Sequence, residues 1–190
     1  VPIDNHVVVE FRKAGVPVWG EVELAYNYDK GTVLAITGTN GKTTTTALVG
    51  QIVKAYNEQT YVVGNIGNSY TGEVLKTSEN SYTVAEISSF QLETVHRFHP
   101  VVSAILNITP DHLNRHHTME CYAHTKERIA ENQTKDDVCV LNMEDEELYR
   151  FGSECKASVV WFSSKRKPDK GAYLDGDDIR YTDGTQDKLM

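Results

Sequence analysis

The sequence predicts an α/β fold, with a mostly parallel sheet, a phosphate-binding loop and flanking helices. Short apolar, strand-like runs alternate with stretches of helical periodicity over most of the 190 residues. A Gly-rich turn containing Gly-Lys-Thr separates the first strand-like run from the first long helical stretch. Polar residues follow later strand-like runs, where ligands collect in parallel sheets. This alternation is typical of strands joined by helical crossovers.

The expected elements follow in order along the chain. A helix should begin near Lys42, because Leu48, Ile52 and Tyr56 recur at helical spacing. Further helices are expected over residues 69–77, 119–132 and 145–152. The expected strands are short runs of mainly apolar residues at positions 33–36, 61–63, 81–87, 101–108, 138–141 and 158–162.

The two ends differ from the middle. Residues 1–28 indicate a helix near Val7 and Phe11, a short strand at 16–19 and a helix at 21–26. These elements are too few to close a sheet, so residues 1–28 are interpreted as the tail of a preceding domain. After Ser163 the sequence becomes rich in Lys, Asp and Gly, and small antiparallel strands are expected at 172–174 and 179–182.

Composition narrows the class of protein. Lys and Arg number 19 against 27 Asp and Glu, which gives a net charge of −8 and argues against a nonspecific nucleic-acid binder. The sequence has no long apolar run and no visible secretion signal, so we expect no membrane association. Cys121, Cys139 and Cys155 are odd in number and widely spaced, which fits a reducing cytoplasm better than a disulfide scaffold or a zinc site.

The strongest motif is the Gly-rich turn between a strand and a helix. Glycines let backbone N–H groups point at a phosphate, and the helix start adds a positive dipole end. Lys42 can reach the β- and γ-phosphates, and the Thr43 hydroxyl can ligate Mg²⁺. Two residues separate Gly38 from Gly41, whereas the usual loop has four. The alternative is a plain Gly-rich turn. The predicted nucleotide-binding residues are Gly38, Thr39, Asn40, Gly41, Lys42, Thr43 and Thr44.

A second set of polar residues is expected at the same sheet edge. Glu86 ends one strand and can hold Mg²⁺, and Asp111-His112 follows the next strand. The alternatives are an ordinary charged residue at a strand exit and a structural histidine. Lys126 lies on the helix 119–132, where residues alone favour a solvated charge. The remaining candidates are interpreted as surface or local-packing histidines: His116, His117 and His124.

Together these motifs resemble those of the Mur ligase family. The loop Gly38–Thr44 is similar to the ATP loop shared by Mur ligases and folylpolyglutamate synthases. Glu86–Glu93, Asn107–His116 and Tyr122–Lys126 resemble further blocks of the Mur ligases, in the same order. Ser-Ser-Phe-Gln at residues 88–91 favours the members that add D-glutamate. The resemblance extends to residues 138–142 and to the first residues of the chain.

The resemblance implies a role for each matching residue. Lys42 and the loop amides would hold the ATP phosphates, while Thr43 and Glu86 would serve a first Mg²⁺ and His112 a second. Lys126 would be carbamylated by CO₂ and so become an anion able to bind the second metal. Lys42, Lys126 and His112 are the expected catalytic residues. The residues expected to face the nucleotide-sugar substrate or the metal shell are Asn65, Ser88, Ser89 and Gln91.

The implied reaction is ATP-driven amide formation in peptidoglycan precursor synthesis. The terminal carboxylate of UDP-N-acetylmuramoyl-L-alanine would form an acyl phosphate, and the amine of D-glutamate would then displace phosphate. Positioning and charge neutralisation carry such phosphoryl transfers. The resemblance further implies a cytoplasmic, monomeric enzyme without nucleic-acid or membrane partners.

The resemblance also sets expectations about domains. Residues 1–28 would be the end of an N-terminal domain, and residues 29–190 a central ATP-binding domain. That domain would lack its last helix, which carries a His-Asn-x-x-Asn pattern in the family, and the C-terminal domain would be absent. We therefore expect the isolated chain not to ligate D-glutamate.

Two alternatives remain open from the residues. One is a sibling ligase such as a folylpolyglutamate synthase, which the Ser-Ser-Phe-Gln block disfavours. The other is a P-loop switch, which needs loops that sense the γ-phosphate. Nothing in the sequence identifies such loops.

Overall fold

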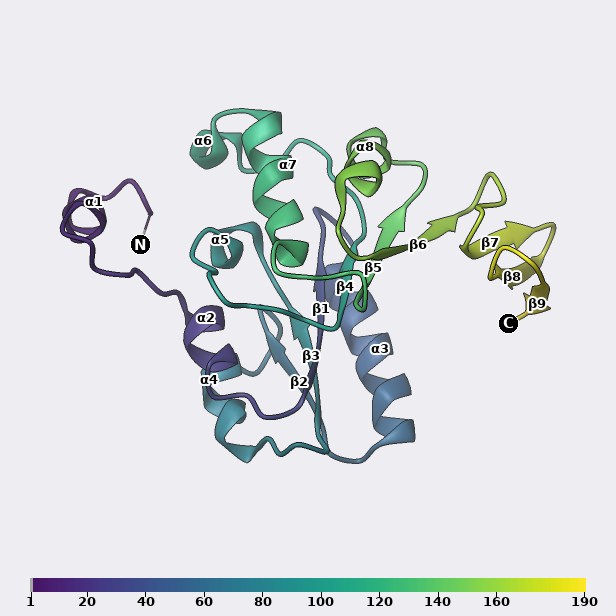
Figure 1. Ribbon diagram of the computed structural model, residues 1–190, viewed down its shortest axis with the longest axis horizontal. Coiled ribbons are helices and arrows are strands. Elements are labelled where there is room, and N and C mark those ends of the chain that lie inside the picture. Colours follow the sequence, from purple (N-terminus) through teal and green to yellow (C-terminus); the bar gives the residue numbers. More distant parts are fainter. Residues whose placement is uncertain (1) are drawn as a thin grey trace.

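A nine-stranded sheet forms the centre of the computed structural model, which describes residues 2–190 (Figure 1). The strand order is β2-β3-β1-β4-β5-β6-β7-β8-β9. Neighbouring strands from β2 to β7 run parallel, and β7, β8 and β9 pair antiparallel. The prediction of a mostly parallel sheet with a small antiparallel region at its C-terminal end is confirmed. The strands are β1 Thr32–Thr37, β2 Thr60–Gly64, β3 Tyr82–Glu86, β4 Val102–Ile105, β5 Val138–Asn142, β6 Ser158–Ser163, β7 Gly171–Asp175, β8 Asp178–Thr182 and β9 Asp187–Leu189.

The helices connect these strands and are mostly short. Ser69, Thr118 and Asp145 cap three of them, since each side chain accepts a hydrogen bond from a backbone N–H of the first turn. None of the helices within residues 2–190 is long and apolar enough to cross a membrane. The helices are α1 His6–Lys13, α2 Glu21–Tyr26, α3 Lys42–Tyr56, α4 Tyr70–Glu73, η1 Val74–Lys76, α5 Ser89–Leu92, α6 Leu113–His116, α7 Met119–Glu127, η2 Arg128–Ala130 and α8 Glu146–Glu154.

Helices cover both faces of the sheet, and one face carries more of them than the other. The crossover from β1 to β2 runs one way along the sheet, and the crossovers from β2 to β6 run the other way. Because parallel crossovers are right-handed, α3 lies on one face and the later helices lie on the opposite face. Figure 1 shows this separation, with α3 across the strands from α4, α5 and α7. On the α3 face, Val102, Ala104, Val140 and Phe162 line an apolar hollow of about 370 Å³.

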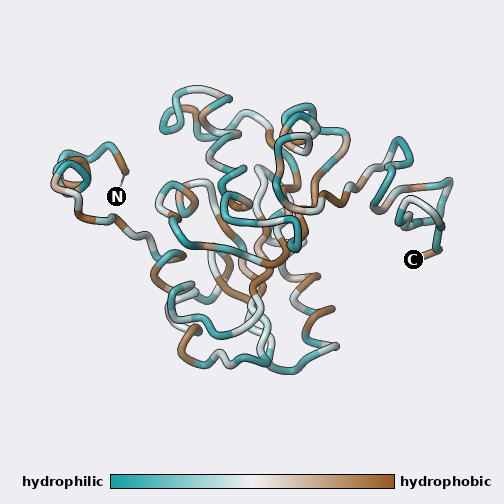
Figure 2. The backbone as a smooth tube through the Cα atoms, viewed as in Figure 1, coloured by the Kyte–Doolittle hydropathy of each residue, from teal (hydrophilic) through white to brown (hydrophobic). Residues whose placement is uncertain are grey.

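The core lies between the sheet and the larger helix layer. Hydrophobic residues concentrate along the central strands and hydrophilic residues along the outer loops (Figure 2). Tyr122 and Ile129 of the α7–η2 segment are almost fully buried in the same core as Ile105 of β4 and Leu141 of β5. The core residues contributed by strands include Val33, Ala35, Val63, Ala85, Ile105, Cys139 and Leu141.

The chain ends project from this body in opposite directions (Figure 1). The predicted helices near residues 7–11 and at 21–26 are confirmed, but α1 buries no residue. The predicted strand at residues 16–19 is wrong, because this segment has no strand partner. Pro17 has no N–H to donate, and the carbonyl oxygen of Val18 lies 3.1 Å from the Nε2 atom of His96, so a side chain takes the place of a strand ladder.

Helix α2 packs against the body although it precedes β1. Val22 and Ala25 belong to the same core as the strands. Glu23 is fully buried, and its carboxylate accepts hydrogen bonds from the backbone N–H groups of His96 (2.8 Å), Arg97 (2.8 Å) and Phe98 (3.2 Å). The division of the chain at residue 28 stays a prediction.

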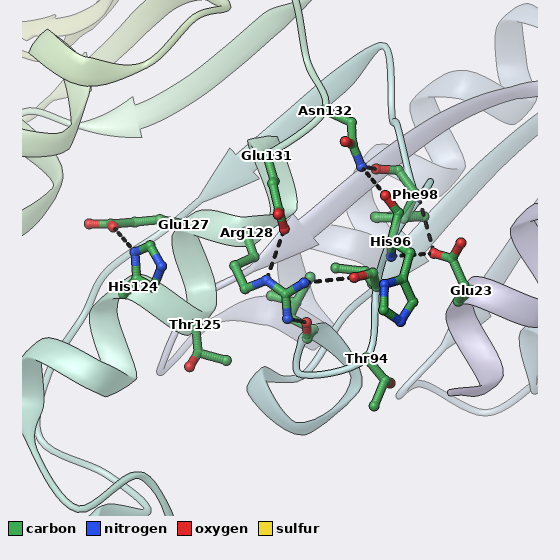
Figure 3. Close-up of polar contacts among 12 residues, drawn as sticks. Glu23, Thr94, His96, Phe98, His124, Thr125, Glu127, Arg128, Glu131 and Asn132 are labelled. Carbon is green, nitrogen blue, oxygen red and sulfur yellow. Dashed lines mark hydrogen bonds and ion pairs between the residues drawn. The ribbon is translucent and has the colours of Figure 1, made fainter. Parts of the chain in front are cut away.

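The loop that receives Glu23 is also held from its other side (Figure 3). Arg128 donates to the carbonyl oxygens of Leu92 (2.8 Å) and Val95 (2.6 Å). Asn132 donates to the carbonyl oxygens of His96 and Phe98, both at 3.0 Å. Three successive N–H groups of the connection from α5 to β4 are therefore satisfied by α2, and several of its carbonyl groups are satisfied by side chains of η2 and the residues just after it.

Replacing Glu23 should test this buried contact. Glu23→Ala leaves three buried N–H groups without an acceptor, so the free energy of unfolding should fall by about 3 kcal/mol. Urea unfolding at pH 7 measures the change. Glu10→Ala, which removes an exposed ion pair with Lys13, should change the free energy of unfolding by less than about 0.5 kcal/mol. Equal effects of the two substitutions would contradict a stabilising role for the buried hydrogen bonds of Glu23.

Candidate active site

The Gly-rich loop lies between the end of β1 and the start of α3, as predicted. Gly38 has φ 152° and Gly41 has φ 81°, and Gly41 is the N-cap residue of α3. Both angles are unfavourable for residues with a Cβ, which explains the two glycines. Lys42, the first residue of α3, folds back so that Nζ donates to the carbonyl oxygens of Gly38 (3.0 Å) and Thr39 (2.9 Å).

Asn107 braces this loop from the end of the neighbouring strand β4. Its Oδ1 atom accepts from the N–H of Asn40 (2.8 Å), and its Nδ2 atom donates to the carbonyl oxygen of Asn40 (3.1 Å). The N–H of Thr39 donates to the backbone oxygen of Asn107 (2.9 Å). Sequence reasoning gave Asn107 no role. The sequence placed Asn107 inside the strand expected at 101–108, whereas β4 ends at Ile105 and leaves Asn107 in the loop that follows.

Glu86 is the last residue of β3 and is almost fully buried. Its Oε1 atom accepts from Nδ2 of Asn65 (2.9 Å), and its Oε2 atom is buried without a hydrogen-bond partner. Asn65 follows Gly64, which has φ 103° and where a Cβ would lie 2.2 Å from the carbonyl oxygen of Glu86. Glycine is therefore required at residue 64 for β2 to end beside Glu86. A buried carboxylate oxygen without a partner is costly unless a ligand satisfies it.

Lys126 does not behave as the solvated charge that residues alone favoured. It is 2% exposed, and Nζ donates to the carbonyl oxygen of Gly38 (2.8 Å) and lies 4.7 Å from the centre of the Tyr122 ring. Burial, and then the nearby charge of Lys42, lower the pKa of Lys126 to about 7, against an opposing effect of Asp111. An amine with this pKa is substantially neutral at physiological pH.

His112 follows β4 and precedes the short helix α6. It has φ 52°, and its Nε2 atom lies 3.4 Å from the Oδ2 atom of Asp111. The ring is 4.9 Å from that of Phe90, and about half of the side chain is exposed. His112 therefore reaches the mouth of the site from a strained backbone position.

The other histidines divide by burial. His116 is 3% exposed, its Nε2 atom lies 3.1 Å from Oγ of Ser89, and its ring stacks on Phe90. Burial lowers the pKa of His116. The local-packing interpretation is confirmed for His116, and the surface interpretation is confirmed for His117 and His124.

The hollow in front of the loop is lined by six of the fourteen predicted site residues. It has a volume of about 140 Å³ and is lined by Lys42, Asn65, Ser88, Ser89, Phe90, Asp111, His112, Tyr122 and Lys126. Phe90 and Tyr122 are lining residues that had no predicted role. Tyr122 also fixes the loop, since its hydroxyl lies 3.1 Å from Oγ1 of Thr39.

Eight predicted residues do not line this hollow: Gly38, Thr39, Asn40, Gly41, Thr43, Thr44, Glu86 and Gln91. Thr43 and Thr44 are exposed on the first turn of α3. Gln91 lines a neighbouring hollow, and its Nε2 atom donates to Glu21 (3.3 Å). Its Oε1 atom accepts from the N–H of Ser88 (2.9 Å) in a capping box that fixes the start of α5. Gln91 thus holds Ser88 in place.

The residues fit a magnesium ion held partly by a nucleotide. Between residues 2 and 190 no three His, Cys, Asp or Glu side chains are grouped closely enough to cage a metal. Mg²⁺ commonly takes one or two protein carboxylates together with phosphate oxygens and water. The unpartnered Oε2 atom of Glu86 has the chemistry of such a ligand. The α3 N-terminus and Lys42 supply the positive charge that a polyphosphate requires.

Comparison with known proteins now identifies the family. The pattern described as the Mur ligase middle domain matches residues 36–190. The chain belongs to the Mur ligase family. A UDP-N-acetylmuramoylalanine–D-glutamate ligase of Lachnospira eligens is 79% identical over 190 residues, covering 100% of this chain and 42% of that protein. The protein of the same name from Clostridioides difficile is 49% identical, covering 94% of this chain and 40% of that protein. The chain therefore spans about two fifths of these relatives.

Solved Mur ligases share the fold. MurF from Acinetobacter baumannii superposes with a TM-score of 0.63 at 21% identity, covering 90% of this chain and 40% of that one. MurF from Thermotoga maritima, solved in complex with ADP, gives a TM-score of 0.61 at 18% identity, covering 89% of this chain and 42% of that one. At these identities the likeness shows the fold.

The lowered pKa of Lys126 predicts a pH-dependent stability. Because the unfolded lysine binds a proton between pH 7 and about 10.5 and the folded one does not, stability contributed by this group rises with pH across that window. Lys126→Met removes the effect. The free energy of unfolding of the parent minus that of the variant should therefore increase from pH 7 to pH 10, by at most about 1.4 kcal/mol per pH unit.

Urea unfolding in CO₂-free buffers measures this difference. Lys54→Met, on the exposed face of α3, is the matched control and should show no such pH dependence. A difference between Lys126→Met and the parent that stays constant across the window would mean that Lys126 is charged in the folded protein.

Proposed function

We propose that this chain is the ATP- and Mg²⁺-binding core of a ligase that adds D-glutamate to UDP-N-acetylmuramoyl-L-alanine in peptidoglycan precursor synthesis. The observation that carries the proposal is the joining, at one sheet edge, of the loop lysine Lys42, the buried carboxylate of Glu86 and the buried amine of Lys126. The 79% identity to a ligase of that name supports the choice of substrates. We further propose a cytoplasmic, monomeric enzyme.

The loop residues would bind the triphosphate. The N–H groups at the start of α3 point out of the helix end, where the dipole favours anions, and Lys42 adds a point charge. Gly38, Thr39, Asn40, Gly41, Thr43 and Thr44 complete this proposed site. Asn107 holds the backbone of Asn40 from both its N–H and its carbonyl group, so the loop is preorganised for the phosphates.

The metal would be held by few protein groups. Thr43 and Glu86 are the proposed holders of one Mg²⁺, and His112 with carbamylated Lys126 of a second. When bound, the metal supplies neutralisation of phosphate charge. Asn65 orients the Glu86 carboxylate through its hydrogen bond to Oε1, which leaves Oε2 free to bind.

The reaction would be two displacements. The terminal alanine carboxylate attacks the γ-phosphorus and ADP leaves, which gives an acyl phosphate. The amine of D-glutamate then attacks the acyl carbon, loses a proton and displaces phosphate. Lys42 offsets the repulsion between the carboxylate and the triphosphate. Asn65, Ser88 and Ser89 line the hollow and would orient the nucleotide-sugar substrate, with Gln91 holding Ser88.

Lys126 has the chemistry that carbamylation needs. A neutral amine attacks CO₂ and releases one proton, whereas a protonated amine cannot. The pKa of about 7 leaves much of Lys126 neutral at physiological pH. The product is an anion in place of a cation, which would suit a group facing a divalent metal.

Charge removal at Glu86 tests the function. Glu86→Gln keeps an amide oxygen for Asn65 but removes the anion, so kcat should fall by about 100-fold or more in the full-length protein while the fold is retained. Phosphate release that requires both UDP-N-acetylmuramoyl-L-alanine and D-glutamate is the readout. Glu79→Gln, at an exposed turn, is the matched control and should keep full activity.

Two results would reject the proposal. One is phosphate release that does not depend on D-glutamate. The other is thermal stabilisation by GTP but not by the uridine-sugar substrate, which would instead favour a nucleotide-dependent switch. Activity with a folate substrate would favour the sibling ligase.

Native mass measurement tests the carbamate. With bicarbonate present, the protein should gain about 44 Da, the mass of CO₂. Lys126→Ala should show no gain, and Lys54→Ala should gain the same mass as the parent. An equal gain in the Lys126→Ala variant would place the modification on another amine.

A further inference from the structure

Two cysteines far from the proposed active site lie on the same face of the sheet. Val140 of β5 lines the apolar hollow on the α3 face. Because side chains alternate along a strand, Cys139 and Leu141 point to the opposite face, where α8 packs. The side chains of Cys139 and Leu141 are both fully buried.

Helix α8 brings Cys155 towards Cys139. Leu141 contacts the helix at Gly152, where a Cβ would lie 3.6 Å from the Leu141 Cδ1 atom. Because β6 is parallel to β5, the intervening helix runs back along the sheet, antiparallel to β5. On this face of β5, the next residue towards the start of the strand is Cys139. From Gly152, helix α8 continues in the same direction to its C-cap residue, Cys155.

Cys155 packs against the buried core to which Cys139 belongs. Hydrogen bonding between the two side chains, followed by burial, raises the pKa of Cys139. The same hydrogen bond lowers the pKa of Cys155 to about 7, with burial opposing this effect and the backbone of Ala157 assisting it. Cys155 is therefore the thiol of the pair that ionises more readily, and the thiolate is the reactive form of cysteine.

Of the two thiols in this pair, Cys155 is the one that faces solvent. It is partly exposed and lines a hollow of about 260 Å³ between the α7–η2 segment and α8, together with Phe151 and Lys156. Figure 3 shows two polar pairs on the α7–η2 wall of this hollow, His124 with Glu127 and Arg128 with Glu131. A small reagent can thus reach Cys155, while Cys139 is fully buried.

We propose that Cys139 and Cys155 are a covalent modification site that small disulfides convert to an intramolecular disulfide. The Cys155 thiolate attacks a reagent disulfide RSSR, and one RS⁻ leaves. Cys139 then loses its proton and attacks the Cys155 sulfur, and the second RS⁻ leaves. The protein loses two electrons and two protons, and the reagent is reduced to two RSH. The bond ties the end of α8 to β5, and dithiothreitol reverses it.

The experiment uses hydroxyethyl disulfide and full-length protein carrying Cys121→Ser, because Cys121 is exposed and would form its own adduct. After acid quenching and alkylation of free thiols, mass spectrometry of the peptides should show a link between Cys139 and Cys155 with a loss of about 2 Da and no lasting adduct. With Cys155→Ser added, the link should vanish and Cys139 should stay unmodified. With Cys139→Ser added, Cys155 should keep the reagent adduct.

Two outcomes would overturn the proposal. One is a stable adduct on Cys155 while Cys139 remains free in the protein that retains both thiols. The other is a link that forms only in urea, which would mean that the folded thiols cannot meet. Both readings come from the protein with the cysteine pair intact, so they hold even where Cys139→Ser fails to fold. Neither depends on ligase activity.

Discussion

The carbonyl oxygen of Gly38 accepts hydrogen bonds from two lysines, Lys42 at 3.0 Å and Lys126 at 2.8 Å. This shared acceptor joins the Gly-rich loop to α7 and places the buried amine of Lys126 beside the part-buried amine of Lys42. The burial of Lys126, and then the repulsion from Lys42, favour the neutral amine, as the lowered pKa of Lys126 records. The backbone angle that only glycine tolerates well at residue 38 turns the loop carbonyl towards both lysines. Loop shape, helix position and charge state thus depend on one another.

The strand order explains why the other site residues lie near this point. β1 lies between β3 and β4, so the loop after β1 has Glu86 on one side and Asn107 on the other. All these strands are parallel, and their carboxyl ends therefore meet at one edge, where α/β sheets bind ligands. Asn107 fixes the loop backbone, and Asn65 fixes one oxygen of Glu86. The site is built on rigid strand ends, with His112 on the more strained segment that follows β4.

A second network, of hydrogen bonds around the connection between α5 and β4, supports the helices that carry site residues (Figure 3). Glu23 of α2 and Arg128 at the end of α7 bind opposite polar groups of the connection between α5 and β4. This connection therefore fixes α5, which carries Ser89, relative to α7, which carries Lys126. Residues that precede the first strand consequently help to position the site. Displacement of α2 would change the positions of both α5 and α7.

The sequence alone determined the alternation of strands and helices and the phosphate-binding loop. The glycines at residues 38 and 41 and the apolar periodicity determine local backbone structure. They can therefore be interpreted without knowledge of the fold. Tertiary structure decided the rest. Lys126 reads as an ordinary helical lysine until α7 is packed against Gly38, since burial and the approach of Lys42 arise only between distant segments. Asn107 and Tyr122 acquire their contacts with the loop in the same way. The strand expected at residues 16–19 failed for the same physical reason, because a strand needs a partner and propensity supplies none.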